Sequence, residues 1–142
     1  MQIKDLMSRE IEMVSSDTTV KEAAKFMKEF NIGIMPVRDG RRVTGMITDR
    51  DITIRAVAES RNPDTTKVKD IMTPEFFYCY DDDEIEEASK LMESKHVHRV
   101  LVFNHEERPV GIISLGDIAV RGDEKMAGRI LSGVSFPYQH KH

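Results

Sequence analysis

Apolar residues recur along this chain in a pattern that occurs twice. Over residues 18–30 they follow the three- and four-residue spacing of a helix with one buried face: Val20, Ala23, Ala24, Met27 and Phe30. Most of this stripe returns over residues 83–92 with Ile85, Ala88 and Met92. Each stripe has a hydroxyl or an aspartate near its start and an acid three positions later, which predicts a capping box. A methionine in such a stripe is a core residue rather than a cofactor ligand.

Each predicted helix is followed by two short apolar runs with the composition of strands. The first pair covers residues 34–37 and 43–47, and the second pair covers residues 99–103 and the run that ends at Ser114. A proline within the first run, Pro36, predicts an edge strand or a bulge. Polar turns at residues 38–40 and 104–107 close the two hairpins.

The sequence pattern therefore predicts two repeats that share one small fold. Residues 3–7 match residues 68–72 at an offset of about 65 positions, and each segment predicts a helical turn that opens a repeat. We expect an α/β (α+β) protein with repeats at residues 1–62 and 63–123, each β-α-β-β-α, packed as a pseudo-two-fold pair. Residues 124–142 are expected to form a terminal helix, with its apolar stripe on a core edge or a dimer partner, and a tail.

The stretch with the strongest candidates for ligand-binding residues also occurs twice, at residues 45–52 and 111–118. In each copy a strand ends on a hydroxyl residue, Thr48 or Ser114, and an aspartate follows three positions later, Asp51 or Asp117. The hydroxyl predicts a helix cap, and the first turn of that helix offers free backbone N–H groups to an anion. The aspartate either complements the helix dipole or, beside the hydroxyl, grips a ribose diol together with a phosphate.

Composition narrows the class of protein. The 142 residues are 39% hydrophobic and 32% charged, which is typical of a globular domain. The net charge of −4 argues against a dedicated nucleic-acid binder, and no apolar run approaches the roughly 18 residues of a membrane span. We expect a cytoplasmic protein. The lone Cys79 predicts a strand residue rather than a catalytic thiol.

The sequence gives no sign of a catalytic or metal centre. No nucleophile with a base and no pair of carboxylates in a pocket is apparent, so we expect no enzyme and assign no catalytic residue. The acidic run at residues 81–84 is interpreted as a cap cluster at a helix start. His96 and His98 would lie on one face of a strand, but no third residue has convincing ligand spacing, so no metal is expected.

With both repeats laid out, the sequence resembles the cystathionine-β-synthase-type repeat, the CBS domain, as a stand-alone pair. The resemblance covers about 120 residues, and it rests on three strings, which are modestly specific alone and highly specific in this repeated order. They are Val-Lys-Asp-Ile-Met-Thr-Pro, Gly-Met-Ile-Thr-Asp-Arg-Asp-Ile and His-Val-His-Arg-Val-Leu-Val. The resemblance implies an α/β module with two clefts between the repeats, in which many members bind adenine nucleotides as sensors.

The resemblance also implies the site residues. The motif aspartate of the family bonds the ribose hydroxyls, which points to Asp51 with Thr48 and to Asp117 with Ser114. Each cleft would need both repeats. Asp51 is expected to face Phe76, Val97, His98 and Arg99, and Asp117 to face Ile11, Ile32, Gly33 and Ile34.

The two clefts are expected to differ in charge. Residues 97–100 resemble the strand that meets phosphate in the nucleotide-sensing subunit of AMP-activated protein kinase, although His98 and Arg99 also fit a solvated strand start. Arg99 offers a forked donor suited to phosphate, and Arg50 lies within the first motif. We therefore expect the Asp51 cleft to bind phosphorylated adenosine more tightly.

The favoured interpretation is a regulatory sensor that binds AMP, ADP or ATP, requires no cofactor and acts on an unknown regulated protein. The alternative is a dimerisation or partner-binding module with empty clefts. A homodimer is expected in either case, through the apolar residues of the second helix of each repeat: Ile52, Ala56, Val57 and Ile118.

Overall fold

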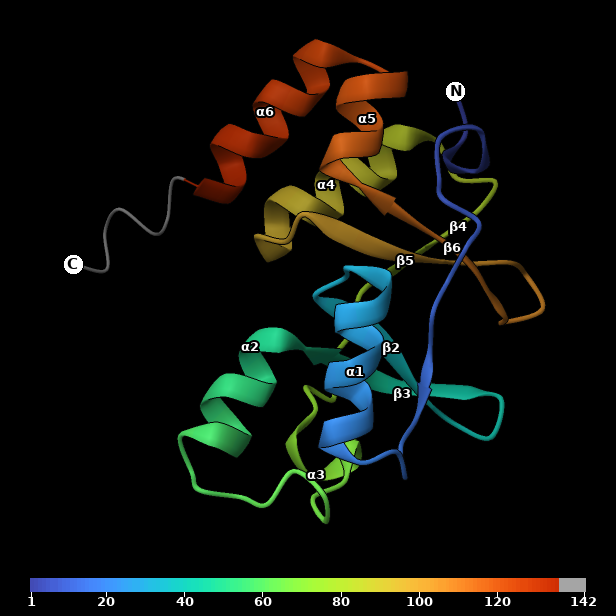
Figure 1. The fold of residues 1–142 in the computed structure, drawn as a ribbon. Coiled ribbons are helices and arrows are strands. Elements are labelled where there is room, and N and C mark those ends of the chain that lie inside the picture. Colours follow the sequence, from blue (N-terminus) through green and yellow to red (C-terminus); the bar gives the residue numbers. More distant parts are fainter. Residues whose placement is uncertain (136–142) are drawn as a thin grey trace. The chain divides into compact units, whose positions relative to one another are not determined.

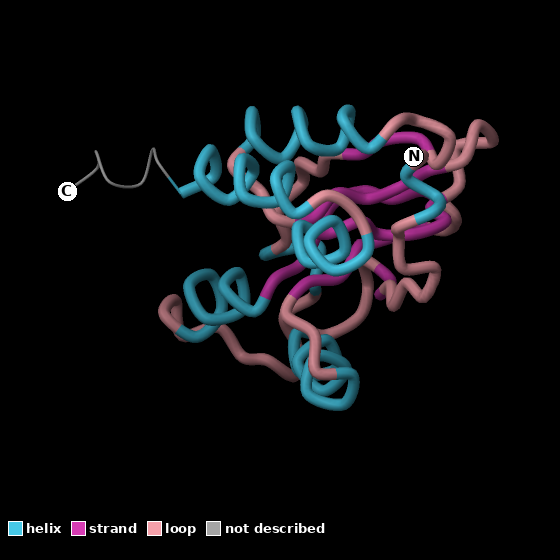
Figure 2. The backbone as a smooth tube through the Cα atoms, turned by 90° about the horizontal axis from the view of Figure 1, so that it is seen from above, coloured by secondary structure: helices cyan, strands magenta, loops and turns pink. Residues whose placement is uncertain are grey.

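The structure is a computed structural model that describes residues 1–135 of the chain. It contains two compact units. The first-repeat unit is Glu12–Phe76, and the second-repeat unit is Met1–Ile11 together with the described part of Phe77–His142. Each unit has a three-stranded sheet with helices, so the mixed α/β class is confirmed (Figures 1 and 2). The expected tail, residues 136–142, lies outside the described residues.

In the first-repeat unit, the chain forms a sheet in the order β1-β2-β3. Its elements in sequence are β1 (Val14–Ser15), α1 (Val20–Phe30), β2 (Ile34–Asp39), β3 (Arg42–Thr48), α2 (Asp49–Asp51), η2 (Ile52–Val57) and α3 (Val68–Ile71). β2 pairs parallel with β1 and antiparallel with β3. The edge position expected from Pro36 is wrong, because β2 is the central strand; the bulge lies one residue further on, between Val37 and Arg38.

The second-repeat unit repeats this arrangement with the order β4-β5-β6. Its elements are η1 (Ile3–Asp5), β4 (Tyr78–Tyr80), α4 (Ile85–Lys95), β5 (Arg99–Phe103), β6 (Pro109–Ser114), α5 (Leu115–Arg121) and α6 (Glu124–Ser135). β4 and β5 are parallel, and β5 and β6 are antiparallel. The expected terminal helix is therefore present as α6, which packs on α4 and α5 (Figure 1).

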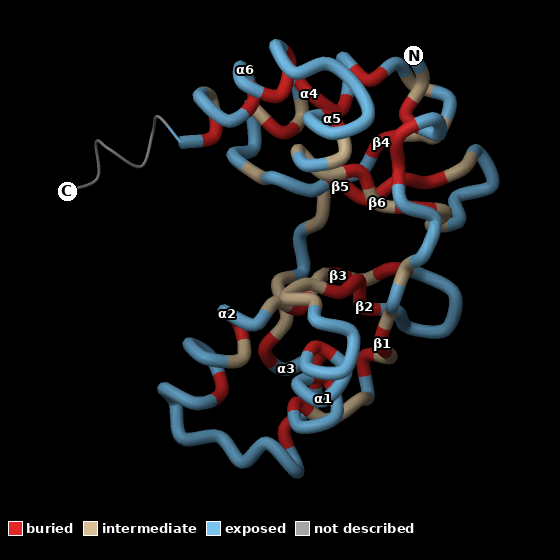
Figure 3. Tube along the Cα trace, turned by 45° about the horizontal axis from the view of Figure 1, so that its top comes forward, coloured by how far each residue is buried: buried red, intermediate tan, exposed pale blue. Residues whose placement is uncertain are grey.

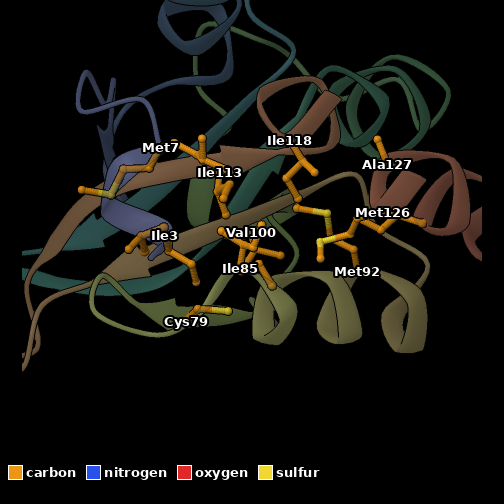
Figure 4. Close-up of a cluster of buried hydrophobic side chains, with 14 of the residues drawn as sticks. Ile3, Met7, Cys79, Ile85, Met92, Val100, Ile113, Ile118, Met126 and Ala127 are labelled. Carbon is orange, nitrogen blue, oxygen red and sulfur yellow. The ribbon is translucent and has the colours of Figure 1, made fainter. Parts of the chain in front are cut away.

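Each unit has its own apolar core, which is seen as the buried stretches in Figure 3. In the second-repeat unit, Ile3 and Met7 from the start of the chain lie among residues of the sheet and of α4, α5 and α6 (Figure 4). Three stripe residues of α6 join this core, Met126, Ala127 and Ile130. Leu131 was expected with them, but it is 50% exposed. On α1 two residues of the predicted stripe, Ala24 and Phe30, are likewise exposed.

The helix starts differ from each other in their caps. Thr19 caps α1, and its hydroxyl accepts the N–H of Glu22 at 3.2 Å. The acidic run was expected to cap the equivalent helix, but Glu84 at the N-cap of α4 makes no side-chain cap bond. Its carboxylate accepts a hydrogen bond from the amino group of Met1 at 3.1 Å instead. The acidic run therefore lies at the start of α4 as expected, with Glu84 as the N-cap residue, but the side-chain cap bond is absent.

A short segment pairs with the last strand of each sheet, next to the glycine that begins each repeated motif, Gly45 or Gly111. Thr73 forms an antiparallel bridge with Met46 in the first-repeat unit, and Ser8 forms one with Ile112 in the second-repeat unit. A Cβ atom on Gly45 would lie 2.5 Å from the carbonyl oxygen of Thr73. One on Gly111 would lie 2.7 Å from that of Ser8. The glycine that opens each motif thus makes room for the crossing backbone.

No helix within residues 1–135 is long and apolar enough to cross a membrane.

Candidate functional site

The first motif places Asp51 at the start of a helix in the first-repeat unit. Thr48 ends β3 in an extended conformation and becomes the N-cap of α2. The N–H of Asp51 donates to the Thr48 hydroxyl at 3.0 Å, and the N–H of Thr48 donates to the Asp51 carboxylate at 3.0 Å. This reciprocal capping box fixes the carboxylate at the positive end of the helix.

Asp51 has two further neighbours, and the sequence interpretation missed one of them, Thr73. The hydroxyl of Thr73 lies 3.2 and 3.3 Å from the two carboxylate oxygens, and Nε of Arg55 lies 3.9 Å from one of them. The Arg55 guanidinium also donates to the carbonyls of Ile71 and Met72. As a result the Asp51 side chain is only 10% exposed. The available signal was Thr73 itself, which stands in the Met-Thr-Pro string.

The helix after Asp51 changes geometry at once. α2 runs into the π-helical turns of η2, and the hydroxyl of Thr53 donates to the carbonyl of Asp49 at 3.0 Å. That carbonyl is the acceptor that the N–H of residue 53 would use in an α-helix, so side chain and backbone compete for it. The equivalent helix α5 has Ala119 at this position and stays α-helical.

The second motif builds the same box with fewer partners. Ser114 caps α5, the N–H of Asp117 donates to its hydroxyl at 3.0 Å, and the N–H of Ser114 donates to the carboxylate at 2.9 Å. Within residues 1–135 the Asp117 carboxylate has no other hydrogen bond. Arg121, the counterpart of Arg55, donates to the carbonyl of Leu6 at 3.4 Å. The Asp117 carboxylate is thus the less engaged of the two.

The segment that enters the central strand of each sheet lies beside the capped helix of its own unit. The N–H of Asp49 donates to the carbonyl of Gly33 at 2.9 Å, and the N–H of Leu115 donates to that of His98 at 2.8 Å. Thr48 pairs with Ile34, and Ser114 pairs with Arg99. Each cap hydroxyl therefore lies next to a strand entry.

The predicted site residues fall into two groups, one in each unit. The first-repeat unit holds Ile32, Gly33, Ile34, Thr48, Arg50, Asp51 and Phe76. The second-repeat unit holds Ile11, Val97, His98, Arg99, Ser114 and Asp117. Their expected pairing across the repeats stays a prediction. The side chains expected to meet phosphate, those of Arg50, His98 and Arg99, are exposed.

The histidines that resembled a metal pair do not share a strand. His96 is the C-cap of α4 with a left-handed φ of 56°, and His98 precedes β5. The residues whose ligand atoms do converge, within 4.8 Å of one another, are Asp81, Asp82 and His105. Their proximity reflects an ion pair at the surface, in which Nε2 of His105 lies 2.7 Å from the carboxylate of Asp82.

The hydrogen bond to Asp82 raises the pKa of His105 above its ordinary value of 6.5. A raised pKa means that the pair stabilises the fold fully below about pH 6.5, and that this contribution is lost as the pH rises through the folded-state pKa. In an NMR titration of the histidine ring protons we expect Asp82→Asn to lower the His105 pKa. Asp81→Asn is the matched control. It should lower the His105 pKa less than Asp82→Asn does, because Asp81 acts on His105 through charge alone. Equal effects of the two variants would contradict the role of the hydrogen bond.

The one cysteine offers no reactive thiol. Cys79 lies in β4, where burial raises the pKa of its thiol to about 12. A thiol with this pKa stays protonated at neutral pH, and the thiolate is the nucleophilic form. Cys79 is therefore a core residue, as its strand position predicted.

Comparison with known proteins gives a consistent result for both halves of the chain. A family model of the CBS domain matches residues 3–57 and 68–122. The CBS domain-containing protein YhcV of Bacillus subtilis is 34% identical over 139 residues, which are 97% of this chain and 98% of YhcV.

Solved structures agree with this match. Hypoxic response protein I, solved with two coordinated zinc ions, has a TM-score of 0.76 and 31% identity, over 87% of this chain and 100% of that one. The CBS domain pair of protein MJ0100, solved with 5′-methylthioadenosine and S-adenosyl-L-methionine, has a TM-score of 0.72 and 25% identity, over 91% of this chain and 98% of that one.

Proposed function

The chain belongs to the CBS-domain family, and on this premise we propose that it is a non-catalytic regulatory module that binds adenine nucleotides. The ligand is AMP, ADP or ATP, and the module needs no cofactor of its own. It senses the nucleotide in the cytoplasm and passes the bound state to a regulated protein.

The observation that carries this proposal is the pair of capped aspartates. A carboxylate has about four acceptor positions. Asp51 uses two of them for the Thr48 N–H and the Thr73 hydroxyl, and Asp117 uses one for the Ser114 N–H. Each carboxylate therefore retains acceptors for a ribose diol. The binding of two adenosine compounds by the CBS pair of MJ0100 supports the same ligand class.

We assign the phosphate part of the ligand to exposed basic residues, two arginines and one histidine. Arg50 follows Thr48 at the helix start, and His98 and Arg99 precede and open β5. Charge-assisted bonds from such groups to phosphate are about twice as strong as neutral ones. This supports a phosphorylated adenosine rather than a bare nucleoside.

A thermal-shift panel of AMP, ADP, ATP, NAD and S-adenosylmethionine tests the proposal. A ligand at about 100 times its dissociation constant stabilises the folded state by about 2.7 kcal/mol. We expect the three adenine nucleotides to raise Tm and ribose 5-phosphate, which lacks the base, to leave it unchanged. If no compound in the panel raised Tm at millimolar concentration, ligand sensing would be refuted.

The dimerisation alternative is supported by exposed apolar side chains, one of which, Val57, was among those first expected at the dimer contact. Ile118 and Ala56 are buried in their own units, with 0% and 2% exposure, so the expectation that a monomer exposes them is wrong. The exposed ones on the second helices are Ile54, Val57 and Val120. A homodimer remains part of our proposal, and sedimentation that found only monomer at micromolar concentration would remove it.

A further inference from the structure

Arg55 of η2 contacts both the motif aspartate of the first-repeat unit and the end of α3. Its Nε lies 3.9 Å from the Asp51 carboxylate, and its Nη1 donates to the carbonyl oxygens of Ile71 and Met72 at 3.2 and 3.1 Å. Both acceptors lie at the C-terminal end of α3, where the last carbonyls have no partner within the helix. The guanidinium is thus attached to the fold and to the aspartate at the same time.

The segment that holds Arg55 is itself well fixed. Ile71 belongs to the core of the first-repeat unit, and Met72 packs against that core. The next residue, Thr73, exchanges two backbone hydrogen bonds with Met46 of β3, at 2.8 and 2.9 Å. A forked guanidinium bonded to two carbonyls of such a segment has little freedom to move. Arg55 is therefore a fixed charge, although its side chain is 50% exposed.

Three groups from separate elements fix the two oxygens of the Asp51 carboxylate. The N–H of Thr48 donates to Oδ2, and the closest approach of Arg55 is to Oδ1. The hydroxyl of Thr73 lies within reach of both oxygens, at 3.2 Å from Oδ1 and 3.3 Å from Oδ2. Rotation of the carboxylate about its Cβ–Cγ bond would take both oxygens away from these partners. The plane of the carboxylate is therefore set before any ligand binds.

The second-repeat unit has the same residue types without this contact. Arg121 follows Asp117 as Arg55 follows Asp51, and it donates to the carbonyl of Leu6 at 3.4 Å. In the part of the chain that the structure describes, Arg121 makes no ion pair with Asp117. The helices differ here, because η2 is π-helical and α5 is α-helical. The contact between arginine and aspartate is thus particular to the first site, although both repeats carry the residues for it.

On the basis of the proposed binding of adenine nucleotides, we propose that Arg55 is a positioning residue that makes the first site select ribose over deoxyribose. The two hydroxyls of a ribose can donate to both oxygens of one carboxylate only when the carboxylate plane faces the diol. Arg55 sets that plane through Oδ1, and it offsets the charge of a carboxylate that a ligand would bury further. A 2′-deoxyribose lacks one of the two donors, so it leaves one oriented acceptor of Asp51 without a partner.

A purely structural role of Arg55 leads to a different expectation. If the arginine only capped α3, its loss would weaken the binding of every nucleotide to the same extent, because the damage would not depend on the sugar. The ratio of the dissociation constants of a deoxyribonucleotide and its ribonucleotide would then stay constant. If Arg55 positions the carboxylate, this ratio falls when Arg55 is replaced.

Calorimetry with ATP and 2′-deoxy-ATP measures this ratio. All proteins carry Asp117→Ala, so that only the motif aspartate of the first-repeat unit is present. We expect this parent protein to bind ATP about tenfold or more tightly than 2′-deoxy-ATP, the effect of one hydrogen bond to a charged group. Arg55→Met keeps the length of the side chain but removes its charge and its donors. It should lower the ratio to about threefold or less.

Arg121→Met in the same parent is the matched control, and it should keep the ratio of the parent because Arg121 belongs to the second-repeat unit. Circular dichroism verifies that each variant is folded. If Arg55→Met is not, Arg55→Lys replaces it; lysine keeps the charge but not the forked donor, so the ratio should fall less.

The proposed role of Arg55 is overturned if ATP and 2′-deoxy-ATP weaken equally in the Arg55 variant, so that the ratio stays at the value of the parent. It is also overturned if the parent binds the two nucleotides equally well. If the parent binds neither nucleotide, the proposed function itself fails at this site, and the role of Arg55 fails with it.

Discussion

Gly45→Ala is expected to lower the free energy of unfolding of the first-repeat unit by about 1–3 kcal/mol, the usual range for overpacking. The reason is steric. The new methyl group would lie 2.5 Å from the carbonyl oxygen of Thr73 and 3.1 Å from Cα of Pro74. Both atoms are backbone, and Thr73 is held there by two hydrogen bonds with Met46, of 2.8 and 2.9 Å. The segment must therefore move or lose these bonds.

Gly111→Ala should have the same effect on the second-repeat unit, because its methyl group would lie 2.7 Å from the carbonyl oxygen of Ser8. Gly128→Ala is the matched control, since a Cβ atom there meets nothing within 4 Å and alanine favours the interior of α6 by about 1 kcal/mol. Urea unfolding of the three variants measures these changes. If Gly45→Ala or Gly111→Ala matched the wild type, the close approach would not be a constraint on the fold.

Asp51→Ala is expected to abolish the tight isotherm for AMP or ATP in calorimetry, whereas Asp117→Ala should spare it. This follows from the proposed cleft, in which Asp51 meets the arginines Arg50 and Arg99 and the imidazole of His98. One charge-assisted bond contributes about 1.5–3 kcal/mol, which separates the two sites by about tenfold or more. If Asp117→Ala alone removed the tight isotherm, the proposed inequality of the clefts would be wrong.

The loss of the Asp51 side chain also removes one of the two bonds of the capping box, so a control for stability is needed. Capping contributes about 1 kcal/mol, and urea unfolding of Asp51→Ala shows whether the protein remains folded. Thr73→Val removes the hydroxyl that donates to Asp51 but keeps the carboxylate. Thr73→Val should retain the tight isotherm, with a dissociation constant within a few-fold of that of the wild type. A complete loss in Thr73→Val would mean that the threonine itself holds the ligand.

The sequence predicted the elements well where a local pattern decides them. Helices α1 and α4 and the capped starts at Thr48 and Ser114 follow from spacing and side-chain chemistry within a few residues. The π-helical turns of η2 were not predicted, because helical periodicity does not distinguish them from an α-helix. The hydrogen bond from the Thr53 hydroxyl to the Asp49 carbonyl accompanies these turns, and it is apparent only in the structure.

Burial at the ends of the stripes depends on what packs against them. Phe30 and Leu131 fit the helical spacing, but they are 42% and 50% exposed. Ile118 was expected at a dimer contact, but it is buried in the core that residues of α6 complete. Thr73 is 22 positions from Asp51, and its hydrogen bond to that carboxylate has no local sequence signature. The sequence repeat therefore predicts the elements that both units share. It does not predict which segment, distant in the sequence, packs against each unit.

The placement of Met1–Ile11 in the second-repeat unit determines the order in which the protein matures during synthesis. These residues leave the ribosome before residues 12–135, yet Ile3, Leu6 and Met7 have their core partners only after β4, α4 and the later elements have been made. Glu12–Phe76 has all of its own residues much earlier. The nascent chain therefore completes Glu12–Phe76 before the unit that contains Met1–Ile11. Until α4, α5 and α6 have been made, the three apolar side chains of Ile3, Leu6 and Met7 stay unburied.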